Sequence, residues 1–187
     1  VYEYFPDGAP IPFAAAPRPY NRSHVIDAHV VVPDGGADGV LLTHGSRHGG
    51  YSFFVADGRL HYVHNYLGVD RFRVSSTSDV PTGAHVLRAD IVAHGGPDFS
   101  KGTGSPVTVR LFVDDEEVGG GDIPYTVPNL YSTTGLSCGY AAYDSVDPST
   151  YLPPFRYTGA IQRVVLDLSG ESTLHPAAEM TRVMTQQ

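Results

Sequence analysis

Residues 51–65 read YSFFVADGRLHYVHN, two β-rich runs joined by a tight turn. The runs Tyr51–Val55 and Arg59–Asn65 are rich in aromatic and β-branched residues, and Ala56-Asp57-Gly58 separates them. An Asp-Gly pair between such runs indicates a β-hairpin, because glycine adopts a positive φ angle at little cost. The stretch therefore predicts two adjacent antiparallel strands.

The strand pattern continues on both sides of this hairpin. No helical periodicity separates the strands, which argues against a parallel sheet with crossover helices. Many short strands divided by turn residues are typical of an antiparallel β-sandwich or barrel. The expected further strands lie in residues 24–32, 39–43, 71–75, 85–92, 107–113, 136–140 and 159–168.

The two ends of the chain differ from this central part. Residues 1–22 contain five prolines, a density that predicts an extended arm rather than a strand or helix. Residues 171–187 contain Pro176 followed by Ala177, Met180 and Val183 at helical spacing, which predicts a short C-terminal helix. We therefore expect an arm over residues 1–22, a β-sandwich over 23–170 and a helical tail over 171–187.

Composition excludes several classes of function. The 187 residues carry a formal net charge of −8, which argues against a nucleic-acid partner. No apolar run is long enough to span a bilayer, so no membrane partner is expected. A single cysteine excludes an intrachain disulfide and a zinc site built on several thiolates. With no leader-like segment in the sequence, a cytoplasmic location is the default expectation.

Few residues form a recognisable catalytic or metal-binding motif. The nine histidines include no H-E-x-x-H pair, and His61 and His64 point to opposite faces of one strand, so we expect hydrogen-bonded histidines rather than a metal site. Cys138 has no evident partner base and is expected to be a buried core residue. Asp144 and Asp147 are better calcium candidates than the acidic run at 114–117, which is expected to be a solvated turn. Even so, the favoured role of Asp144 and Asp147 is to shape their loop through hydrogen bonds.

A polar and aromatic surface is the remaining candidate site. Tyr, His, Asn and Arg side chains together offer a flat apolar plate with a polar rim, which suits a sugar ring or a partner protein. The same residues would also suit the outer face of a sheet covered by the N-terminal arm, and both interpretations stay open. The candidate residues are His44, Arg47, His48, Tyr62, His64, Asn65 and Tyr66.

Several segments in order resemble one protein family. Residues 49–68 read GGYSFFVADGRLHYVHNYLG, and this stretch resembles the C-terminal β-domain of large bacterial arylsulfatases of the actinobacterial type. The resemblance covers residues 1 to 170, so it concerns nearly the whole chain. Supporting segments are NRSH at 21–24, PDGGADGVL at 33–41, LFVD at 111–114 and PFRYTG at 154–159.

The resemblance implies a concanavalin A-like jelly roll and a parent enzyme that hydrolyses sulfate esters. Such enzymes use a formylglycine and a calcium ion in an upstream catalytic domain. The formylglycine motif C/S-x-P-x-R is absent here, since Gly139 and Tyr140 follow Cys138. We therefore expect no catalytic residue, no metal and no cofactor in this chain. The expected function is a non-catalytic accessory domain that packs on the sulfatase catalytic domain, shapes its active-site rim or self-associates.

Two other functions compete with this expectation. A carbohydrate-binding, lectin-like module would use the polar and aromatic surface to bind a glycan. A small enzyme with a histidine–carboxylate site would need an acid and a base in one cleft, and the sequence shows no such pair at a fixed spacing.

Overall fold

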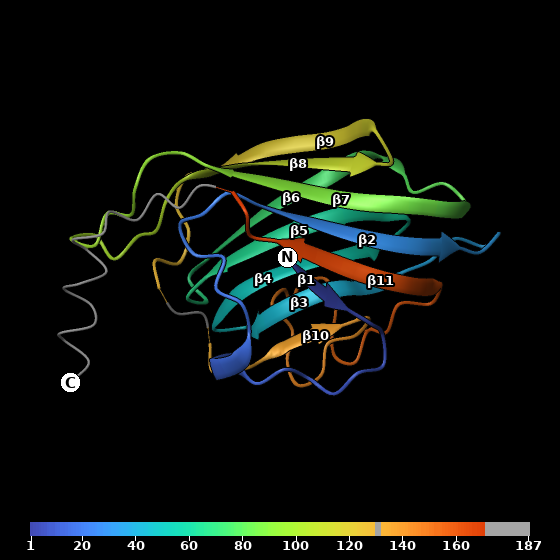
Figure 1. Cartoon of the computed structure of the whole chain (residues 1–187), viewed down its shortest axis with the longest axis horizontal. Helices are drawn as coiled ribbons and strands as arrows, with labels where there is room; N and C mark the ends of the chain where they lie inside the picture. Colours follow the sequence, from blue (N-terminus) through green and yellow to red (C-terminus); the bar gives the residue numbers. More distant parts are fainter. Residues whose placement is uncertain (130–131, 171–187) are drawn as a thin grey trace.

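The computed structural model describes residues 1–129 and 132–170, and these form two layers of β-sheet (Figure 1). The expected C-terminal helix at 171–187 lies outside the described residues. No helix among the described residues is long and apolar enough to cross a membrane. The strands are β1 (Tyr2–Tyr4), β2 (His24–Val32), β3 (Gly39–Ser46), β4 (Gly49–Ala56), β5 (Arg59–Tyr66), β6 (Asp70–Asp79), β7 (Gly83–Ala93), β8 (Val107–Val113), β9 (Glu116–Ile123), β10 (Leu136–Cys138) and β11 (Ala160–Asp167), with a 3-10 turn η1 (Phe13–Ala15).

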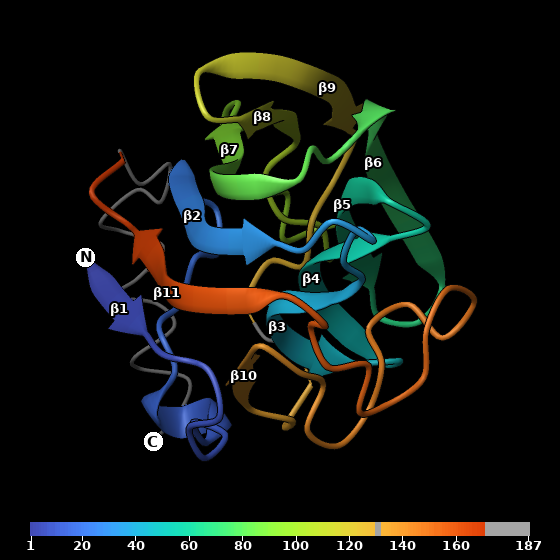
Figure 2. The ribbon, with the colours of Figure 1, turned by 90° about the vertical axis from the view of Figure 1, so that its right-hand side faces the viewer.

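The strands pair into one larger and one smaller sheet. The larger sheet has the order β1-β11-β2-β7-β8-β9, and the smaller has the order β10-β3-β4-β5-β6. All neighbouring strands run antiparallel, and Figure 2 shows the two sheets facing each other. This arrangement confirms the expected all-β, jelly-roll sandwich.

The hairpin formed by β4 and β5 has the expected geometry. Val55 pairs with Leu60 and Ala56 with Arg59 across β4 and β5. Asp57 and Gly58 have φ angles of 49° and 73°, so both turn residues have positive φ, as a two-residue hairpin turn between twisted strands requires.

The N-terminal arm is more regular than its prolines suggested. Tyr2–Tyr4 forms β1 and pairs with β11, which corrects the expectation that the arm makes no strand. The physical reason is that the first proline is Pro6, so the residues before it keep the N–H groups that a ladder needs. The arm then crosses to the smaller sheet, where Ile11 and Leu136 exchange two backbone hydrogen bonds of 2.9 Å.

The main hydrophobic core lies between the sheets. Alternate residues of each strand face inward, and the largest side chains that are fully buried there include Tyr51, Phe53, Leu87 and Leu111. On one side the sheets come together through β6 and β9, where a Cβ on Gly119 would lie 2.5 Å from the Ser75 carbonyl oxygen. On the other side, the N-terminal arm spans the distance between the edge strands β1 and β10 (Figure 2).

A second apolar cluster covers the other face of the smaller sheet. Segment 139–158, which we call the covering segment, contributes Ala141, Val146 and Tyr151 to this cluster. They pack on Phe54 and Val63 from β4 and β5. Figure 2 shows the covering segment in orange along the outer side of β3 and β4. The central strands of the smaller sheet are therefore buried on both faces.

Four histidines are buried among the described residues, and burial lowers the pKa of three of them furthest. His24, His44 and His64 are 6%, 0% and 2% exposed. Burial lowers the pKa of His24 and of His44 from 6.5 to about 4, and that of His64 to about 3. His64 Nε2 accepts a 3.0 Å hydrogen bond from the Val127 N–H, so the neutral ring holds the chain after β9.

We predict that acid destabilises the protein in a defined window. The unfolded state binds protons near pH 6.5, whereas the folded state does so only near pH 3 to 4, so the free energy of unfolding falls as pH decreases through this window. One histidine pKa lowered from 6.5 to about 4 corresponds to about 3 kcal/mol at most. Urea unfolding at a series of pH values measures this slope.

His64→Gln provides the matched control for the acid prediction. Its amide oxygen can still accept from Val127, but the side chain does not titrate. The slope of unfolding free energy against pH should fall by about one proton in this variant. An unchanged slope, or a wild-type stability that does not vary between pH 6.5 and 4, would contradict the assignment.

Candidate functional site

Four of the seven residues expected on a ligand surface are buried. Tyr62 stacks on Tyr51 between the sheets, with ring centroids 6.2 Å apart. The Asn65 side chain donates to the carbonyl oxygens of Val146 (2.8 Å) and Arg47 (3.1 Å). The cause is the position of β3 and β5 inside a sheet whose two faces are covered. The four buried residues are His44, Tyr62, His64 and Asn65.

The other three candidates lie at loop ends and do not form one patch with the buried four. Arg47 and His48 are exposed in the β3–β4 turn. The Arg47 guanidinium makes a two-pronged contact with Asp144, with Nη2–Oδ1 at 2.9 Å and Nε–Oδ2 at 3.0 Å. Tyr66 is half-buried at the end of β5, where its hydroxyl donates 2.9 Å to the Gly102 carbonyl oxygen.

The covering segment is anchored by polar contacts as well as by apolar ones. The Asp147 side chain is nearly fully buried and accepts hydrogen bonds from Arg73 and from Thr150, the latter at 2.7 Å. The Tyr151 and Ser52 hydroxyls are hydrogen-bonded at 2.8 Å in the interior. These contacts cover the outer face of β4 and β5, where Ser52, Phe54 and Val63 are fully buried.

Both aspartates that the sequence offered as calcium candidates are bound by arginines. Asp144 pairs with Arg47, and Asp147 pairs with Arg73. Within residues 1–129 and 132–170, no group of three His, Cys, Asp or Glu side chains is arranged to hold a metal ion. The contacts match the loop-shaping role that the sequence favoured for these residues.

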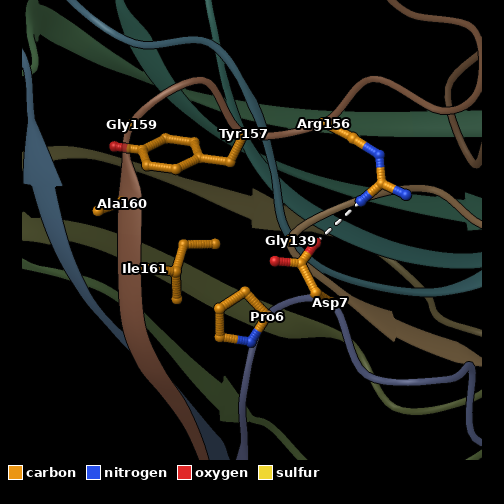
Figure 3. A pocket seen from close by; sticks show the side chains of 8 residues that line it. All are labelled: Pro6, Asp7, Gly139, Arg156, Tyr157, Gly159, Ala160 and Ile161. Carbon is orange, nitrogen blue, oxygen red and sulfur yellow. Dashed lines mark hydrogen bonds and ion pairs between the residues drawn. The ribbon is translucent and has the colours of Figure 1, made fainter.

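An open pocket of about 260 Å³ lies where the N-terminal arm meets the start of β11 (Figure 3). We call it the arm pocket. Figure 3 shows Asp7 and Arg156 on one side of it, with the Tyr157 ring and Ile161 on the other. Glycines contribute two lining positions, which leaves backbone rather than side chains there. The lining residues are Pro6, Asp7, Gly139, Arg156, Tyr157, Gly159, Ala160 and Ile161.

The arm pocket combines opposite charges with aromatic rings. Arg156 Nη1 lies 3.1 Å from Asp7 Oδ1. The Arg156 guanidinium carbon also lies 4.5 Å from the centroid of the Tyr140 ring, and the Tyr140 hydroxyl donates 3.0 Å to the Gly8 carbonyl oxygen. Burial raises the pKa of Tyr157 to about 12, so its hydroxyl is neutral at physiological pH. The pocket therefore offers a cation, a carboxylate and the exposed part of one tyrosine ring, Tyr157, which is 9% exposed.

Sequence reasoning missed this pocket. In the sequence, Arg156 is notable only as part of the segment 154–159, and Asp7 only as part of the arm. The two residues are 149 positions apart, so no local motif joins them. The available signal was an isolated arginine flanked by aromatic residues, Phe155 and Tyr157, in a proline-rich loop.

A second group of aromatic rings lies at the end of β5 and β6. Tyr66 and Phe72 each contact Tyr125 edge-on, at centroid distances of 5.0 Å. The Tyr125 hydroxyl donates 2.7 Å to Asp70 Oδ2, a hydrogen bond that raises the Tyr125 pKa. We call these three half-buried rings the aromatic platform.

Comparison with known proteins gives structural neighbours alone. No protein-family model and no curated protein matches the chain. The carbohydrate-binding module CBM40 of a Ruminococcus gnavus IT-sialidase, solved with α2,3 sialyllactose, superposes with a TM-score of 0.54 at 8% identity, covering 87% of this chain and 82% of that one. The LG4-5 domains of mouse laminin α1 match with a TM-score of 0.50 at 13% identity, over 86% of this chain and 39% of that chain. At identities this low, the superpositions establish a shared fold and assign no function to this chain.

The neighbours overturn the function expected from the sequence. A sulfatase accessory domain should resemble other sulfatase domains, whereas the chain matches a carbohydrate-binding module and laminin domains. The expectation of a sulfatase accessory domain is therefore wrong. The jelly-roll fold that the same resemblance implied is confirmed.

We predict that Asp147 is needed to hold the covering segment. Asp147→Ala leaves the Arg73 and Thr150 donors without their acceptor and removes the buried carboxylate, so it should lower the free energy of unfolding by about 2 kcal/mol. Asp79→Ala breaks an exposed 3.7 Å ion pair with Arg59 and should change stability little. Urea unfolding of both variants tests the difference, and equal effects would contradict it.

Proposed function

We propose that this chain is a non-catalytic carbohydrate-binding module whose ligand site is the arm pocket. The observation that carries the proposal is the combination of a guanidinium, a carboxylate and a tyrosine ring, Tyr157, around one open pocket. The fold gives independent support, because a structural neighbour over most of the chain is a module solved with a bound sialyllactose.

The pocket chemistry matches what a sugar requires. A pyranose ring presents an apolar face of C–H groups and a rim of hydroxyls, so a site needs a flat apolar surface beside polar groups that donate and accept. Tyr157 and Ile161 supply apolar surface, Arg156 donates, and Asp7 accepts. A volume of about 260 Å³ lies just below the usual range for ligand pockets, about 300–1,000 Å³, and suits a terminal sugar rather than a long chain.

The same residues support binding rather than hydrolysis. Glycoside hydrolysis ordinarily requires two carboxyl groups on opposite sides of the scissile bond. Asp7 is the single carboxylate among the residues that line the arm pocket. Cys138 is a poor nucleophile, because burial raises the pKa of its thiol to about 12.

The aromatic platform is the second candidate for the sugar site. Its rings are half-buried, and Asp70 adds a carboxylate at the edge of Tyr125. Within the described part of the chain, no guanidinium lies over the platform rings, and the Tyr66 and Tyr125 hydroxyls already donate to Gly102 and Asp70. The arm pocket is therefore the better supported of the two.

A glycan array with three variants tests the proposed function and its location. We expect the wild-type chain to bind glycans through their terminal sugars and Arg156→Ala to lose at least tenfold in affinity, because a charge-assisted contact contributes about 1.5–3 kcal/mol. Arg59→Ala, an exposed arginine of the β4–β5 hairpin, is the matched control and should bind as the wild type does. Loss of binding in Tyr66→Ala instead would move the site to the aromatic platform, and silence on a broad array would contradict the function.

A further inference from the structure

We propose that the arm pocket selects acidic sugars, with Arg156 as the anion-binding residue and Asp7 as an internal counter-ion that the ligand displaces. The inference rests on the proposed function and adds the chemical class of the ligand. It starts from the ion pair on one side of the pocket, between Arg156 Nη1 and Asp7 Oδ1 at 3.1 Å (Figure 3).

The ion pair between the two residues is easily exchanged. The Asp7 side chain is 84% exposed and the Arg156 side chain 56% exposed, and they meet through one contact, Nη1 to Oδ1. An exposed pair of this kind contributes at most about 1 kcal/mol, because water solvates both charges well. A ligand carboxylate that contacts two guanidinium nitrogens in parallel would make a stronger interaction than Asp7 does.

Arg156 does not depend on Asp7 for its position. Its guanidinium carbon lies 4.5 Å from the centroid of the Tyr140 ring, a cation–π contact. The Tyr140 hydroxyl is fixed in turn by its 3.0 Å hydrogen bond to Gly8. When Asp7 moves away, the guanidinium therefore keeps its orientation, and the ligand does not have to order a long side chain on binding.

Asp7 is placed so that it can leave the pair without disturbing the core. It lies in a turn of the arm with a φ angle of 62°, a conformation that aspartate tolerates better than most residues. Its side chain can turn to water without breaking a buried contact, since it is already mostly exposed. Until then its negative charge opposes the entry of an anion. An acidic ligand must therefore bind Arg156 more strongly than Asp7 does in order to displace it.

The rest of the chain makes this local cation selective. The formal net charge of −8 repels anions over the protein as a whole. Arg156 is the single cationic side chain among the residues that line the arm pocket. An anion that binds here must therefore do so through Arg156 and not through a general basic surface.

The test uses sugars that differ mainly by a carboxylate. We would titrate the whole chain with glucuronic acid against glucose, and with sialyllactose against its neutral methyl ester, by calorimetry. The wild type should bind each acidic sugar more tightly than its neutral partner. Arg156→Gln should remove this preference, whereas Asp7→Asn should strengthen acidic binding by about twofold to fivefold, the range that loss of an exposed pair of 0.4–1 kcal/mol allows.

The matched control separates local displacement from net charge. Asp115→Asn removes one negative charge in the exposed β8–β9 turn and should leave the affinity for acidic sugars unchanged. Equal gains from Asp7→Asn and Asp115→Asn, or equal wild-type binding of acidic and neutral sugars, would overturn the inference while leaving carbohydrate binding intact. Binding of neither kind of sugar would overturn the proposed function together with it.

Discussion

Burial of the smaller sheet on both faces is the constraint from which the rest of the structure follows. Its inner face packs on the larger sheet, and its outer face packs under the covering segment through Phe54, Val63 and Tyr151. Burial of apolar surface is the main stabilising contribution to a fold of this kind. The polar contacts of Asp147 and of the Tyr151 hydroxyl then fix the position of the covering segment on that face.

This constraint decides where a ligand can bind. Because the covering segment occupies the outer face of β4 and β5, the open surface shifts to its ends, where the chain leaves β10 and enters β11. The N-terminal arm closes the gap between the edge strands at the same place. The arm pocket thus forms where three segments that are distant in sequence meet, and both its charged residues belong to loops rather than to strands.

Burial also separates the titratable groups into two kinds. The histidines of the interior keep a neutral ring at physiological pH, because their protonated form would have to be desolvated. The Asp7 and Arg156 pair, by contrast, is solvated and weak. A rigid interior and a weak, exposed ion pair suit the proposed binding module. Its scaffold has to stay fixed while the groups that meet the ligand change partners.

The sequence by itself determined most of the strands, though not β1, together with the hairpin at 51–65 and the two-layer architecture, because apolar alternation and turn residues act over a few positions. Alternation shows which residues share a face, but not what covers that face. Tyr62, His64 and Asn65 therefore suited a surface until the structure showed Tyr62 and His64 between the two sheets and Asn65 bonded to Val146 of the covering segment. Only the tertiary structure decided the site. Asp7 and Arg156 meet across 149 positions, and a contact at that separation depends on the packing of the whole chain.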